Sequence, residues 1–323
     1  MPPSLPFPLP RRALLATPLA APALAQADYP SRPVRFVVPG PAGGAGDVLG
    51  RLVMERLSAR FGQPFTVENR PGAGTNIGMT VVARAAPDGY VLGLASIAAN
   101  AVNRWLYRSL PFNPETDFAP IGMIALVPNL MVIPPSVPAR NVQEFIAWGR
   151  ANRVAFGSVG AGSSQHLAGA QFGLATGLDM THVAYTANGP MTTDLIENRV
   201  QALFQSISAV AELARAGRVR PIAVTGEARA PAFPDVPTMR EQGVDIVSTG
   251  WFGVCAPAGT PEPILERLNG ALNAILAEPE IEARIIQGGA VPRRTTRAEM
   301  AAFMAAESAR WRPVIQATGA TAD

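Results

Sequence analysis

Val34-Arg35-Phe36-Val37-Val38 is followed by Pro39-Gly40-Pro41-Ala42-Gly43-Gly44-Ala45-Gly46-Asp47, and Val154-Ala155-Phe156-Gly157-Ser158 is followed by Val159-Gly160-Ala161-Gly162-Ser163-Ser164. Each stretch begins with an apolar run typical of a buried strand and continues into a loop of small residues. Each loop then leads into an amphipathic segment with the periodicity of a helix. The two loops begin 120 residues apart. This repetition predicts two α/β lobes, each presenting one such loop.

The rest of the chain alternates in the same way. Short β-rich runs are predicted as strands, and segments with apolar residues on one helical face as helices. The capping box Thr296-Arg297-Ala298-Glu299 predicts the start of the last helix. Further strands are expected at 65–68, 90–95, 181–185, 200–204 and 219–225, and helices at 47–61, 75–85 and from Pro261 onward.

Two long apolar segments, 121–133 and 247–256, are predicted to cross between the lobes and to form the hinges. The first lobe is then expected to consist of residues 28–127 plus 252–323, and the second of residues 128–251. Trp251 falls at the second crossing.

Composition excludes several classes of protein. All cations are arginines and no lysine is present, which removes Walker A loops and Schiff-base chemistry. The single cysteine, Cys255, allows neither an intrachain disulfide nor a thiolate zinc site, and two histidines are too few for a histidine-rich metal cluster. The chain has no basic stripe interleaved with aromatic residues, which is the pattern that indicates nucleic-acid binding. We therefore expect no cofactor, no metal and no nucleic-acid partner.

The first 27 residues have the features of an export signal. Arg11-Arg12 precedes an apolar stretch, and Ala25-Gln26-Ala27 matches a small-residue cleavage site, which places Asp28 at the mature N-terminus. The apolar stretch is too short to span a bilayer. A disordered Pro-rich tail is the alternative interpretation. The leader predicts periplasmic localisation, by the Sec route or, given the twin arginine, by Tat.

The two small-residue loops are candidate anion sites. The first amides of a helix lack acceptors and carry a partial positive charge, and small side chains let a ligand approach them. Tight turns that need glycine only for their geometry are the competing interpretation. Because the positive charge comes from backbone dipoles and not from lysine, a carboxylate is the favoured ligand.

Catalytic patterns are weak. No G-x-S-x-G elbow is present. Ser163 and Ser164 are expected to cap a helix, Asp47 to complement a helix dipole, and His166 and His182 to be structural. A periplasmic hydrolase that uses Ser164 and His166 remains a second hypothesis.

The chain resembles the Bug, or tripartite tricarboxylate transporter, solute-binding proteins from about Tyr29 to Gly319. The resemblance rests on the first loop and on later motifs in the same order. These are Glu68-Asn69-Arg70-Pro71-Gly72-Ala73-Gly74, Pro87-Asp88-Gly89-Tyr90, Gly162-Ser163-Ser164-Gln165-His166, Phe233-Pro234-Asp235-Val236-Pro237 and Trp251-Phe252-Gly253.

This resemblance implies a periplasmic-binding-protein fold, α/β, with two lobes joined by two crossing hinge segments and closing on a small carboxylate. It implies a non-catalytic, monomeric binding protein that delivers its ligand to the membrane subunits of a tripartite transporter. A sensory partner that presents ligand to a receptor kinase is the alternative. The ligand-binding residues carried over are Gly40, Pro41, Ala42, Gly43, Gly44, Ala45, Gly46, Asp47, Asn76, Ser96, Gly160, Ala161, Gly162, Ser163, Ser164, Tyr185, Gln205 and Ser206.

The chain departs from the family at one informative position. Phe204-Gln205-Ser206 stands where many members have Phe-Asp-Ser. The usual aspartate can pair with the ammonium group of an amino-acid ligand, and a glutamine lacks that charge. Gln205 therefore makes an amino-acid ligand less favoured and is predicted to set selectivity.

Overall fold

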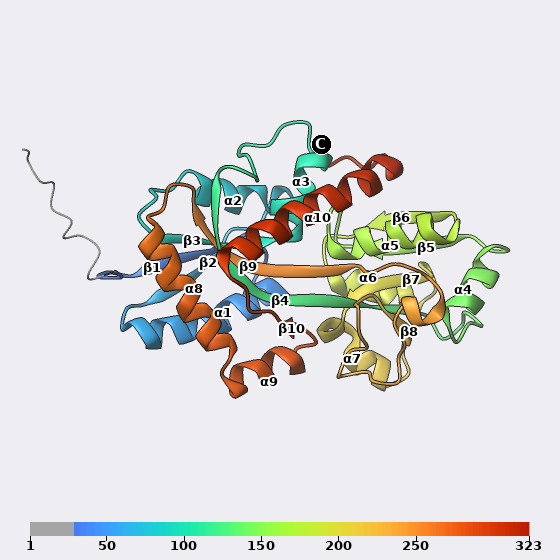
Figure 1. Cartoon of the computed structure of the whole chain (residues 1–323). Helices are drawn as coiled ribbons and strands as arrows, with labels where there is room; N and C mark the ends of the chain where they lie inside the picture. Colours follow the sequence, from blue (N-terminus) through green and yellow to red (C-terminus); the bar gives the residue numbers. More distant parts are fainter. Residues whose placement is uncertain (1–28, 323) are drawn as a thin grey trace, which may run out of the picture.

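The computed structural model describes residues 29–322, so the predicted leader lies outside the described residues. Figure 1 shows two α/β lobes side by side, joined by the long strands β4 and β9. The strands are β1 (Val34–Val38), β2 (Phe65–Asn69), β3 (Val91–Ser96), β4 (Phe118–Ile133), β5 (Val154–Ser158), β6 (Met180–Ala184), β7 (Ala202–Ser206), β8 (Arg220–Val224), β9 (Thr249–Pro257) and β10 (Val291–Pro292).

The helices surround this sheet. They are α1 (Ala45–Phe61), α2 (Asn76–Ala83), α3 (Asn103–Leu106), α4 (Val142–Gly149), α5 (Ser164–Thr176), α6 (Asn188–Ile196), α7 (Ile207–Arg215), α8 (Glu262–Leu276), α9 (Pro279–Gln287) and α10 (Arg297–Thr318), with short turns η2 (Ala73–Thr75), η3 (Ala98–Val102) and η4 (Arg240–Gln242). Across the described residues, no helix is long and apolar enough to cross a membrane.

The sheet runs in the order β2-β1-β3-β9-β4-β7-β5-β6, and β8 and β10 also pair with β4. We call β1–β3 and β10, with α1–α3 and α8–α10, the first lobe, and β5–β8, with α4–α7, the second lobe. Strands β1, β2 and β3 pair in parallel, as do β5, β6 and β7. Parallel pairing is the arrangement that strand–loop–helix repeats require.

Side-chain alternation along the strands produces a core on each face of the sheet. In the first lobe, Leu92, Leu94 and Val254 pack in a cluster that includes α1, α8 and α9, and we call this side the α1 face. Ala95 and Cys255 point to the other side and pack with α2, η3 and α10. In the second lobe, one cluster includes α4 and α5 and another includes α6 and α7. Both faces of the sheet are therefore covered by helices, as in α/β proteins generally.

Strand β4 takes part in both lobes. Residues 118–128 pair with β9, and residues 129–133 pair with β7 and β8. Thr225 fixes β4 at Asn129, where the pairing changes from one lobe to the other. The Thr225 hydroxyl accepts from the Asn129 N–H at 2.9 Å, and the Thr225 N–H donates to the Asn129 carbonyl at 2.9 Å. The α/β fold with two lobes agrees with the sequence prediction, and the limits 28–127 plus 252–323 and 128–251 stay a prediction.

Helix α10 adds a third link between the lobes. Met304 and Trp311 of α10 share a cluster with Leu167 of α5 and with Trp251 of β9. The Arg310 guanidinium also donates to the Val247 carbonyl, just before β9. Figure 1 shows α10 running from the first lobe toward α5. Any hinge motion must therefore be accommodated by this helix as well as by β4 and β9.

Cys255 lies in β9 with no exposed surface. Burial raises the pKa of its thiol to about 12, so the group stays protonated at neutral pH. The cysteine is part of the packed core.

Candidate functional site

The first loop is held in place by the buried carboxylate of Asp47. Its Oδ2 accepts from the Gly43 N–H at 2.9 Å and from Arg51 Nε at 3.1 Å, and its Oδ1 accepts from Asn69 Nδ2 at 2.9 Å. Burial raises the pKa of Asp47, but the hydrogen bonds from Arg51, Gly43 and Asn69 outweigh it and hold the pKa below its usual value. The carboxylate is therefore ionised and engaged within the protein, where it clamps the loop to β2.

The loop presents unused amides at the start of α1. Gly44 is the N-cap with an extended backbone, and no side chain caps the helix. The first-turn amides of an α-helix have no acceptor within the helix, so the N–H groups of Ala45 and Gly46 are available to a ligand. The dipole of the 17-residue helix favours negative charge at this end.

The second loop is stabilised by serine side chains. Ser163 is the N-cap of α5, and its Oγ accepts from the His166 N–H at 3.2 Å and donates to the Gly160 carbonyl at 2.7 Å. Ser158, at the end of β5, accepts from the Gly160 N–H at 3.1 Å. The capping role expected for Ser163 is confirmed, and the amides of Ser164 and Gln165 remain available at the start of α5.

Gln205 is part of a chain of amide side chains beneath this loop. Gln165 accepts from the Val159 N–H at 2.8 Å and donates to Gln205 Oε1, while Gln205 Nε2 donates to Asn188 Oδ1 at 3.1 Å. Gln205 has no exposed surface. Its carboxamide is therefore engaged with neighbouring side chains, and its predicted influence on selectivity would act through Gln165 and Asn188. Sequence reasoning missed both, because a glutamine inside a helix and an asparagine at a helix start carry no distinctive pattern.

The two histidines lie against each other behind the second loop, with ring centroids 4.4 Å apart. His166 Nδ1 accepts from the Gly162 N–H at 3.3 Å, and His182 Nε2 lies 2.7 Å from Ser158 Oγ. Burial, together with the neighbouring His182, lowers the pKa of His166 to about 4. Both rings are therefore neutral at pH 7 and hold the backbone of the loop.

The His166 pKa predicts a loss of stability in acid. Between the ordinary pKa of 6.5 and about 4, the unfolded chain binds a proton that the folded protein excludes. The free energy of unfolding therefore decreases as the pH falls through this range, by about 3 kcal/mol for this group. Urea unfolding at pH 7 and pH 4.5 should show a smaller decrease for His166→Asn, which keeps an acceptor for Gly162. Equal decreases in the two proteins would contradict the assignment.

The starts of α1 and α5 lie over the same face of β9. Gly250 and Phe252 are two residues apart on this strand, so both face the α1 side. A methyl group on Gly46 of α1 would lie 2.9 Å from the Phe252 ring, and one on Gly250 would lie 3.3 Å from Ser164 Oγ of α5. The two helix N-termini, one from each lobe, are thus supported at points about 7 Å apart along one strand.

The second loop also contacts the first lobe directly. Gly162 has a φ of +80°, and a Cβ there would lie 2.5 Å from Leu106 Cδ1 and 3.3 Å from Val102 Cγ1. Leu106 is in α3 and Val102 is in η3. Only a residue without a side chain allows this approach between the lobes.

The remaining predicted residues lie at strand ends and helix starts. Asn76 begins α2, and its Oδ1 accepts from Asn103 Nδ2 at 2.7 Å. Ser96 ends β3 directly opposite Phe252, on the α1 face. Ser206 ends β7. Tyr185 follows β6, and its hydroxyl donates to Asp194 at 2.7 Å, so its proton is not available to a ligand carboxylate. Ligand contact by all eighteen predicted residues stays a prediction.

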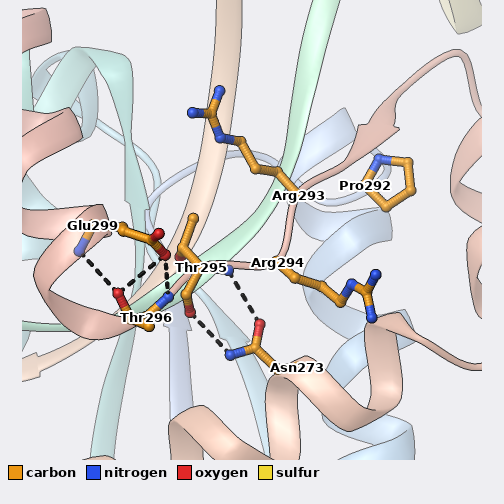
Figure 2. Close-up of a pocket in the computed structure, with 7 residues that line it drawn as sticks. All are labelled: Asn273, Pro292, Arg293, Arg294, Thr295, Thr296 and Glu299. Atoms are coloured by element: carbon orange, nitrogen blue, oxygen red, sulfur yellow. Dashed lines mark hydrogen bonds between the residues drawn. The ribbon is translucent and has the colours of Figure 1, made fainter.

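A pocket of about 630 Å³ lies at the start of α10, away from the two loops. Figure 2 shows hydrogen bonds among Asn273, Thr295, Thr296 and Glu299, and none from the side chains of Arg293 and Arg294 to the other residues drawn. Asn273 pairs with the backbone of Thr295, and Thr296 and Glu299 form the capping box expected from the sequence. The lining includes no residue of the two small-residue loops, so this pocket is not assigned to the site.

Comparisons with known proteins place this geometry in a family. The model of the TctC family, "Tripartite tricarboxylate transporter family receptor", matches residues 49–320. This chain belongs to the TctC family.

Relatives of this TctC protein have the same two-lobed architecture. BugT of Bordetella pertussis is 37% identical over 306 residues, which cover 94% of each chain. The structure of R. palustris Rpa4515 with adipate has a TM-score of 0.84 and 36% identity, and the match covers 91% of this chain and 99% of that one. The structure of the periplasmic binding protein BugD has a TM-score of 0.79 and 31% identity, covering 91% and 99%. The resemblance and the periplasmic-binding-protein fold are thereby confirmed.

The family consists of solute-binding receptors and not of enzymes. His166 Nδ1 accepts from the Gly162 N–H and is thereby engaged with the backbone of the second loop. Among residues 29–322, the hydroxyl bonded to a histidine ring is that of Ser158, 2.7 Å from His182 Nε2, and Ser158 has no exposed surface. Among the described residues, no group of three histidine, cysteine, aspartate or glutamate side chains could hold a metal ion.

Proposed function

We propose that this TctC protein binds a small organic carboxylate between the N-termini of α1 and α5. The observation behind this proposal is that both helix starts pack on one face of β9. The start of α1 lies against Phe252, and the start of α5 lies against Gly250. A carboxylate placed there would accept from amides of both lobes, and each helix dipole would favour its charge. The two loops therefore act as two halves of one anion site.

A carboxylate suits this site better than a cation or an amino acid. The only acidic side chain of the first loop, Asp47, is already neutralised by Arg51 and by hydrogen bonds. Gln205 supplies no negative charge for an ammonium group. Adipate in the related structure of Rpa4515 is a carboxylate of this kind. The ligand class is thus supported both by the donors present and by a relative.

The wider role that we propose follows from the family. The protein captures its ligand in the periplasm as a monomer, the lobes close about β4 and β9, and the closed form delivers the ligand to a tripartite transporter. The Gly162 contact with Leu106 supports closure, because it brings a ligand loop of the second lobe against the first.

Thermal unfolding of the protein, refolded to remove any bound ligand, tests the carboxylate site. Adipate, succinate and citrate serve as the panel, and adipamide, which is uncharged, is the control. A ligand at 1,000 times its Kd stabilises the folded protein by about 4 kcal/mol, which raises the Tm by several degrees. We expect such a shift with at least one carboxylate and none with adipamide. Equal effects of adipate and adipamide, or no shift with the whole panel, would contradict the proposal.

A further inference from the structure

Asn129 is a buried side chain whose polar atoms are both unused. Its exposed fraction is 0%, and neither Nδ2 nor Oδ1 has a hydrogen-bond partner. A buried amide without a partner destabilises the folded protein, because it has given up its hydrogen bonds to water. Such a group in a native protein calls for an explanation, and a bound molecule that completes its hydrogen bonds supplies one.

The side chain lies on the face that carries the proposed anion site. No register shift interrupts β4 between Val127 and Met131, so residues 127, 129 and 131 point to one side. Val127 packs in the α1-face cluster, directly opposite Gly250, and Met131 packs in the cluster that includes α5. Asn129 thus lies between two apolar clusters, at the junction of the lobes.

Neighbouring residues connect Asn129 to both loops. Its partner on β7, directly opposite, is Ser206, which is one of the predicted ligand residues. Ser164 of α5 lies against Gly250, and Gly250 pairs with Val127, two positions before Asn129. The Asn129 side chain is therefore about 7 Å further along β4 than the point over which α5 begins.

The backbone of Asn129 is fixed independently of any ligand. Its N–H donates to Thr225 Oγ1 at 2.9 Å, and its carbonyl accepts from Thr225 N at 2.9 Å and from Thr225 Oγ1 at 3.1 Å. Only rotation of the side chain remains. A donor and an acceptor are thus held ready at a defined place, which reduces the entropy that a bound ligand must lose.

We propose that Asn129 binds a hydroxyl group of the ligand, so that the ligand is a hydroxycarboxylate. This inference rests on the proposed function, because the carboxylate must first be held at α1 and α5. A hydroxyl is the smallest group that can donate to Oδ1 and accept from Nδ2. A second ionised carboxylate would be buried against a neutral amide, at a larger desolvation cost.

Isothermal titration with pairs of acids that differ by one hydroxyl tests this assignment. The pairs are malate with succinate and 2-hydroxyglutarate with glutarate. In the wild-type protein we expect tighter binding of the hydroxy acid of at least one pair. In Asn129→Leu and Asn129→Ala we expect this preference to fall by about tenfold, the value of one well-formed hydrogen bond at a buried site.

Thr249→Val is the matched control. Thr249 lies on β9, directly opposite Pro128 of β4. Its side chain points to the other face of the sheet, where it lines a separate cavity of about 230 Å³. The control should keep the wild-type preference. Melting temperatures establish that each variant is folded. If leucine cannot be accommodated at position 129, the Asn129→Ala variant is used for the titrations.

The outcomes separate the two proposals. If the wild-type protein binds these carboxylates but the Asn129 variants keep the same preference between the members of each pair, the Asn129 assignment is wrong and the carboxylate site stands. An absence of any hydroxyl preference in the wild-type protein would also overturn the assignment. If no carboxylate binds the wild-type protein, the proposed function and this inference fail together.

Discussion

Gly162→Val is expected to lower carboxylate affinity by more than about 100-fold, or roughly 3 kcal/mol. Two effects combine. Valine is disfavoured at a φ of +80°, which distorts the amides at the start of α5. The new side chain would also point at Leu106 Cδ1, which lies 2.5 Å from the Cβ position, and would push the lobes apart. Titration calorimetry with a carboxylate that stabilises the wild-type protein measures the loss.

Gly177→Val is the control for this substitution. Gly177 ends the same helix with a φ of +65°, and nothing lies within 4 Å of its Cβ position. The Gly177→Val substitution should therefore introduce a similar backbone strain but leave the carboxylate affinity unchanged. The double variant Gly162→Val with Leu106→Ala should recover part of the binding. Wild-type affinity in a folded Gly162→Val protein would show that this loop is only a turn.

Asp47→Ala is expected to reduce both stability and ligand affinity. The carboxylate is 4% exposed, and its removal leaves the Gly43 N–H, Asn69 Nδ2 and Arg51 without their acceptor. Hydrogen bonds to a charged group contribute about 1.5–3 kcal/mol each, but Arg51 is half exposed, so we expect a total loss of about 3 kcal/mol. Urea unfolding measures the stability, and calorimetry measures the affinity.

Asp88→Ala provides the comparison for Asp47. Asp88 also accepts from an arginine, Arg32, and from a backbone amide, that of Tyr90, but its side chain is 43% exposed. Its loss should cost less than about 1 kcal/mol and should not change ligand binding. Similar losses in the two variants would contradict the view that Asp47 clamps a ligand loop.

The elements that carry the site could be predicted from local sequence. Strands β1 and β5 occupy the residues expected from their apolar runs, because a buried parallel strand needs a continuous apolar stretch. Helix α1 begins at Ala45, two residues before the expected start, because Ala45 and Gly46 continue the helix without being part of its apolar stripe. Helix α2 ends at Ala83, before the expected Ala85.

The contacts that join the lobes could not be predicted in this way. The apolar pattern marks 121–133 as a crossing segment, but it does not show that β4 is one strand shared by both lobes, because pairing with β9 and β7 depends on residues over 70 positions away. The Gln165–Gln205–Asn188 chain and the unpartnered Asn129 likewise depend on tertiary packing. A polar residue inside an apolar strand, as at Asn129, is the sequence signal that could have drawn attention to this position.

Amide chemical shifts report directly on whether a carboxylate is held between α1 and α5. In a ¹H–¹⁵N TROSY titration of the ligand-free protein with a carboxylate that stabilises it, we expect the first-turn amides of both helices to shift downfield together and to saturate with one Kd. These are the amides of Ala45 and Gly46 in α1 and of Ser164 and Gln165 in α5. The C-terminal residues of the same helices, Arg60 and Thr176, should move little. Saturable shifts confined to one lobe, or centred elsewhere while all four of these amides stay in place, would contradict a carboxylate held between α1 and α5.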